Sequence, residues 1–137
     1  MNRTTGNPFA NMNLKKDIFS AGTQVFGKVK NASISANGNY AVFGIDCADE
    51  NGKHLDVICS FMIANFPSIP AEETNKSMIR AFLSVLAVPI IDGVVQMEEL
   101  SEVIGRQFAA TIEHNINPNS VDQEPTMRLK SYKTIKE

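Results

Sequence analysis

Two Asn-Gly pairs, Asn37-Gly38 and Asn51-Gly52, each separate two segments in which apolar and polar residues alternate. Asn-Gly favours the positive φ angles of a tight hairpin turn, and a two-residue alternation is typical of a strand with one buried face. The pattern therefore predicts three consecutive antiparallel strands, over residues 23–30, 40–46 and 53–63. A chain with such a meander near its start is expected to fold around a β-sheet.

A helical period follows these strands, because apolar residues now recur at spacings of three and four. We expect Ser68 to cap this helix and Pro89 to end it. Asp92-Gly93 predicts a turn, and a short second helix is expected to end near Gly105. The apolar stripe of the main helix consists of Met78, Ile79, Phe82, Val85 and Leu86.

Two further strands are predicted from renewed alternation, one starting at Arg106 and one after a polar loop over residues 115–125. In the last strand, alternation directs Arg128, Lys130 and Tyr132 outward. The order β-β-β-α-β-β is that of the five-stranded oligonucleotide/oligosaccharide-binding (OB) barrel. We therefore predict an all-β fold, a single OB-like barrel over residues 23–137. Residues 1–22 lack an apolar period and are expected to form a flexible N-terminal arm.

The pairing register of the second and third strands can be deduced if Asn51-Gly52 forms a two-residue turn. That register places Asp46 opposite Val57 and directs the side chain of Phe43 to an exposed, mixed face. It also places Cys47 and Cys59 on opposite faces, which argues against a disulfide between them.

Composition and motifs argue against an enzyme or a membrane protein. The 137 residues lack a glycine-rich phosphate loop, a nucleophile elbow and a paired-cysteine motif, and Cys47, His54 and Cys59 are too few ligands for zinc. We expect no catalytic residue, no metal and no cofactor. No apolar segment approaches the roughly 20 residues that span a bilayer, and no signal peptide is evident, so a cytoplasmic location is expected.

Charge is segregated along a chain that is otherwise nearly neutral. Residues 1–36 carry five basic residues and one acid, and residues 126–137 carry four and one. Residues 61–104 carry six acids and only Lys76 and Arg80. Aromatic side chains next to Lys and Arg are suited to binding single-stranded nucleic acid, because bases stack on aromatic rings while the cations neutralise phosphates. The candidate site, with the loops 36–39 and 115–125 at its rim, comprises Phe26, Lys28, Lys30, Tyr40, Phe43, Arg128, Lys130 and Tyr132.

By element order, residues 23–132 resemble the small OB-fold single-stranded DNA-binding proteins of phages and plasmids. The resemblance is carried by residues 24–30 (QVFGKVK) as the first strand and residues 104–112 (IGRQFAATI) as the strand after the helix. It implies a non-catalytic role in DNA replication or recombination, in the host cytoplasm if the chain is phage-encoded. Many such proteins end in an acidic tail that recruits partners, whereas this chain ends KSYKTIKE.

Alternatives to this function remain open at this stage. The basic strands are also consistent with ordinary protection of sheet edges, and Phe26 with a ring covered by the N-terminal arm. A small inhibitor that binds a host protein through its acidic helical side, or a structural assembly subunit, fits the same pattern. The sequence leaves open DNA against RNA, homo-oligomerisation, and replication or recombination proteins as partners.

Overall fold

The computed structural model describes residues 17–116 and 125–135, which form a mostly β structure with one α-helix. Five strands make an antiparallel sheet in the order β3-β2-β1-β6-β7. The main elements follow the predicted sequence order, with a small hairpin added after the helix. The elements are β1 (Gln24–Ile34), β2 (Tyr40–Ala48), β3 (His54–Met62), α1 (Ile69–Val85), β4 (Ile90–Ile91), β5 (Val94–Val95), the 3₁₀ helix η1 (Leu100–Val103), β6 (Gln107–Asn115) and β7 (Thr126–Lys133).

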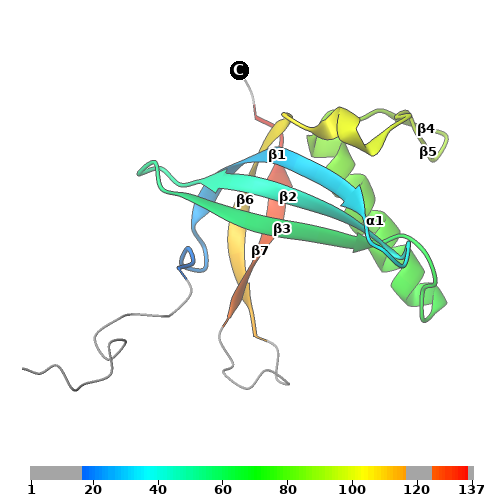
Figure 1. Ribbon diagram of the computed structural model, residues 1–137, viewed down its shortest axis with the longest axis horizontal. Helices are drawn as coiled ribbons and strands as arrows, with labels where there is room; N and C mark the ends of the chain where they lie inside the picture. The colour runs from blue at the N-terminus through cyan, green and yellow to red at the C-terminus, as the bar shows by residue number, and fades with distance from the viewer. Residues whose placement is uncertain (1–16, 117–124, 136–137) are drawn as a thin grey trace, which may run out of the picture.

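The sheet has two halves that share β1. Figure 1 shows β1, β2 and β3 side by side, with β6 and β7 crossing behind them and α1 at one end. β1 pairs with β6 over residues 24–28 and with β2 over residues 26–34. The two edge strands, β3 and β7, also contact each other. The inward side chains of both halves therefore share one core.

Helix α1 closes this core with the predicted apolar stripe. Phe82 is fully buried, and its ring packs against those of Phe43, Phe61, Phe108 and Tyr132 at centroid distances of 5.0–5.5 Å. As predicted, the Ser68 side chain caps the helix by accepting a hydrogen bond from the Ala71 N–H at 3.1 Å. The helix ends at Val85, short of Pro89, because Ala87 adopts a positive φ of 62°. Within the described residues, no helix has the length and apolar content needed to span a bilayer.

The folded unit begins before the predicted boundary at Thr23. Phe19 is only 4% exposed, and its carbonyl oxygen lies 2.7 Å from His114 Nε2. Asp17 forms an ion pair with Lys53 at the β2–β3 turn. Residues 17–22 are therefore part of the packed structure, and the prediction of a free arm is wrong for them. Residues 1–16 lie outside the described part of the chain.

The predicted register of the β2–β3 hairpin is wrong by one residue. Asp46 lies opposite Asp56, not Val57. The Asp49 carboxylate accepts hydrogen bonds from the N–H groups of Asn51 and Lys53, which holds a turn longer than two residues. A one-residue slip reverses the two faces of a strand. The faces of β3 are as predicted, whereas those of β2 are exchanged.

Candidate nucleic-acid interface

The outer face of β1 carries the predicted alternation. Val25 and Val29 are buried, and Phe26, Lys28 and Lys30 point outward. Gly27 fixes this arrangement, because a Cβ at this position would lie 2.9 Å from Ile45 Cγ2 and from Phe108 Cζ. β1 therefore packs closely on the core and presents its aromatic and basic side chains to solvent.

Phe26 is an exposed ring on this outer face. Its side chain is 58% exposed. The residue directly opposite it is Ala48 on β2 and Ala109 on β6. Directly opposed residues lie on the same face of a sheet, so the Phe26 ring is flanked by two methyl groups. No bulky neighbour in these two positions prevents a planar apolar group from stacking on the ring.

Tyr40 is also exposed, at 36%, but lies far from Phe26. It starts β2, eight residues before Ala48, which corresponds to about 26 Å along the strand at ~3.3 Å per residue. The turn over residues 36–39, predicted to be at the rim of the site, directly precedes Tyr40 in the sequence. Of the other rim loop, residues 117–124 lie outside the described part of the chain.

Phe43 is not part of this surface, contrary to the prediction. Its side chain is 3% exposed, and its ring lies 5.0 Å from that of Phe82 and 6.0 Å from that of Phe61. The shifted hairpin register turns the ring into the core. A base therefore has no access to it.

Tyr132 is likewise directed inward, and a neighbouring residue takes its predicted place. Ser131 has a positive φ of 54°, and the β6–β7 register shifts between Ala109 and Thr111. This bulge turns the Tyr132 ring toward Phe108, with 5.8 Å between centroids. It also places Lys133 opposite Ala109 on the outer face, and Ala109 is in turn opposite Phe26. Sequence alternation alone missed Lys133.

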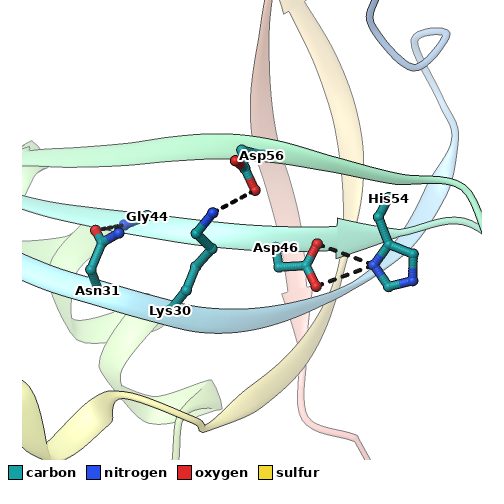
Figure 2. Close-up of polar contacts among 6 residues, drawn as sticks. All are labelled: Lys30, Asn31, Gly44, Asp46, His54 and Asp56. Carbon is teal, nitrogen blue, oxygen red and sulfur yellow. Dashed lines mark hydrogen bonds and ion pairs between the residues drawn. The ribbon is translucent and has the colours of Figure 1, made fainter.

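Lys30 is exposed as predicted, but its charge has a partner. It is the extra residue of a bulge between Val29 and Asn31, and its Nζ lies 2.9 Å from the Asp56 carboxylate on β3. Figure 2 shows the Lys30 side chain reaching across β2 between Gly44 and Asp46. Gly44 is buried beneath Asn31, whose Oδ1 accepts its N–H at 3.1 Å.

A second carboxylate lies on the same half of the outer face. Asp46 is directly opposite Lys28 and contacts His54 Nδ1 at 3.1 Å (Figure 2). The cations over β1, β2 and β3 are therefore close to acids.

The β6–β7 half of the outer face is more basic. Among residues 17–116 and 125–135, Arg128, Lys130 and Lys133 form no ion pair. Lys130 lies opposite Thr111, whose hydroxyl accepts a hydrogen bond from the Gln24 side chain at 2.9 Å. Glu113, opposite Arg128, is the one acid directly opposite these three cations. The outer face thus combines an exposed ring with Lys130 and Lys133, which have no acid directly opposite them in the described structure.

The buried polar groups do not form a reactive site. Cys47 and Cys59 lie on the same side of the sheet, contrary to prediction, but Cys59 is opposite Phe43, about 13 Å along β2 from Cys47 at ~3.3 Å per residue. That separation excludes a disulfide. Burial raises the pKa of each thiol to about 12, and burial also raises the pKa of Tyr132, which shares a hydrogen bond with Cys59. In the described residues, no cluster of three His, Cys, Asp or Glu side chains has the geometry of a metal site.

A scan against protein-family models and a search of curated proteins both find no match to this sequence.

Proposed function

We propose that this protein binds single-stranded DNA without catalysis, through the outer face of β1, β6 and β7. The observation that carries the proposal is the Phe26 ring, 58% exposed between Ala48 and Ala109. A base that stacks on this ring places its phosphates near Lys28, Lys130 and Lys133 on the same face. Ring stacking combined with phosphate neutralisation is how single strands are bound without sequence preference.

The fold assignment in this proposal is an open OB-like barrel. It is supported by the strand order β3-β2-β1-β6-β7, by the helix between β3 and β6, and by the contact between β3 and β7. The setting we propose, phage or mobile-element replication or recombination, rests on the resemblance of element order alone.

The length of the outer face is compatible with a short strand of DNA. Phe26 and Tyr40 are separated by about 26 Å along β2, or roughly eight nucleotides at the 3.4 Å spacing of stacked bases. OB domains cover about 4–16 nucleotides. A strand that stacks on Phe26 therefore lies over the more basic half, and only a strand that ran about eight nucleotides along β2 would reach Tyr40.

The test is fluorescence anisotropy with a labelled oligothymidine and with a duplex of the same length, at low salt. We expect preference for the single strand, because duplex bases are already stacked and hidden. Phe26→Ala is expected to weaken single-strand binding by about 1–3 kcal/mol, or roughly 5- to 150-fold. A matched control is Ile58→Ala, which removes an apolar side chain that is 64% exposed on β3.

We expect Ile58→Ala to leave the affinity unchanged. Equal binding of single strand and duplex, or equal loss in both variants, would refute the stacking role of Phe26. A matched RNA oligomer in the same assay measures the preference between DNA and RNA.

A further inference from the structure

A second candidate site lies at the end of the sheet where α1 and the β4–β5 hairpin are found (Figure 1). It is a pocket of about 260 Å³ lined by apolar side chains. Its floor is formed by Phe43, Phe61 and Phe82, which pack against one another and are at most 3% exposed. The floor is therefore preformed by the core and does not depend on a mobile side chain.

The mouth of the pocket is rimmed by apolar residues that remain in contact with solvent. Ile34, Ile63 and Val95 line the pocket and are 50%, 39% and 36% exposed. The pocket is slightly smaller than the roughly 300–1,000 Å³ of sites for drug-sized ligands. Its size suits one large side chain, and the exposed rim offers further apolar contact around it. Interfaces commonly place an aromatic or aliphatic anchor in such a pocket.

The charges around this mouth indicate which partner is favoured. A neighbouring hollow that shares Val95 and Met97 with the pocket is lined by Glu98 and Glu102. In the described residues, Glu98 forms no ion pair, whereas the Glu102 carboxylate accepts the N–H groups of Glu98 and Glu99.

Cations are fewer on this side of the molecule. Between residues 61 and 104 the basic residues are Lys76 and Arg80. The Lys76 ammonium is already paired with Glu72 at 2.6 Å. Lys76 and Arg80 line another neighbouring hollow, which shares Ile79, Leu83 and Val95 with the pocket. The acids Glu98 and Glu102 therefore lie on the β5–η1 side of the pocket, whereas Arg80 lies on its α1 side. The β5–η1 side is the one that favours a cationic partner.

We propose that this pocket docks a basic segment of a partner protein, which inserts one large apolar side chain onto the Phe43, Phe61 and Phe82 floor. Lysine or arginine residues next to the anchor lie over Glu98, on the β5–η1 side of the pocket. The site is separate from the proposed DNA surface, because Ile34 and Phe26 are eight residues apart on β1, about 26 Å at ~3.3 Å per residue. It does not depend on DNA binding.

The test is an NMR titration of the ¹⁵N-labelled full chain with three synthetic probe peptides. Ac-KKLFKK-amide is expected to bind with a Kd below 1 mM and to shift the amides of Ile34, Ile79 and Val95. Ac-KKAAKK-amide has the same charge without the anchor, and is expected to cause no shift at 1 mM. Ac-EELFEE-amide keeps the anchor with reversed charge, and is expected to bind at least fivefold more weakly.

Two protein variants distinguish the pocket from general attraction. Val95→Lys places a cation on the rim and is expected to weaken Ac-KKLFKK-amide binding at least fivefold. Ile58→Lys adds the same charge on β3, at a 64% exposed position of the outer face, and is expected to leave binding unchanged. A third variant, Glu98→Lys, reverses a charge in the neighbouring acidic hollow and is expected to weaken Ac-KKLFKK-amide binding.

Three results would overturn the proposal. They are an absence of shifts with Ac-KKLFKK-amide at 1 mM, equal shifts with the alanine peptide, or shifts confined to other regions. Pocket shifts that grow with protein concentration alone would assign the site to a second copy of this chain, and would also refute a heterologous partner.

Discussion

The cations of the outer face are expected to contribute unequally to DNA binding, although the sequence treats them alike. Lys133 has no ion-pair partner in the described structure, whereas Lys30 is 2.9 Å from the Asp56 carboxylate. We predict that Lys133→Ala removes a phosphate contact. The charge-neutral double variant Lys30→Ala with Asp56→Ala is predicted to remove none, because the pair has no net charge to offer a phosphate.

The magnitude follows from counterion release. Each neutralised phosphate of a single strand contributes about −0.7 to the slope of log K against log salt concentration. Between 50 and 200 mM salt, a fourfold change, one contact therefore accounts for roughly a 2.6-fold loss of affinity. Lys133→Ala is expected to make the slope less negative by about 0.7. The double variant is expected to keep the slope of the unmodified protein.

The assay is anisotropy with a labelled oligothymidine at four or more salt concentrations between 50 and 200 mM. Phe26→Ala serves as the matched control, since the loss of a ring lowers affinity at every salt concentration and leaves the slope nearly unchanged. If the double variant flattens the slope as much as Lys133→Ala, then the Lys30–Asp56 pair opens on binding and the strand passes over β2 and β3. An unchanged slope for Lys133→Ala would refute its role on the outer face.

Four predictions concern the fold. Phe82→Ala is expected to lower the free energy of unfolding by about 3–5 kcal/mol in urea denaturation, because the Phe82 ring is fully buried. The control Ile69→Ala, on the exposed side of α1, is expected to change the free energy of unfolding by less than about 0.5 kcal/mol. Phe19→Ala is expected to destabilise the protein by a similar mechanism, with about 3 kcal/mol lost in the same assay, and a neutral result would restore the domain boundary predicted at Thr23. Cys47 and Cys59 are expected to be unreactive toward a thiol reagent at pH 8 in the folded state. Burial raises the pKa of each thiol from 9.0 to about 12 in the folded state. The contribution of the two protonated thiols to the free energy of unfolding is therefore fully present below pH 9 and is lost as the pH rises from about 9 to 12. Denaturation at several pH values measures this loss.

Those parts of the fold that follow strict local patterns were predictable from the sequence. The alternation of β1, the alternation of β6 with Phe108, Ala110 and Ile112 inward, and the apolar stripe of α1 each repeat over several residues. One irregular position therefore does not obscure the period. The Ser68 cap was predictable because its hydrogen bond is made to a residue three positions away. Exposure of Phe26, Lys28 and Lys30 follows from the same local alternation.

Which side chains of β2 point into the core was not predictable, because the pairing of β2 with β3 depends on the length of one turn. Asn51-Gly52 correctly marked the turn, and Gly52 has the positive φ of 82° that such a turn requires. The side chain of Asp49, outside that pair, accepts two backbone hydrogen bonds and lengthens the turn. The resulting one-residue shift moved Phe43 from the candidate site to the core.

The residues of the candidate site could also be predicted only in part, because some of them are set by contacts between residues far apart in the sequence. Counting charges by segment treats Lys30 as a free cation, whereas strand pairing brings it next to Asp56, twenty-six positions later in the sequence. Conversely, alternation places Lys133 on the inner face of β7, and only the positive φ of Ser131 turns it outward. This bulge also seats Tyr132 against Phe82 and Phe108. The core therefore gains a ring at the position where the outer face gains a cation, so a substitution that removed the bulge would disturb both together.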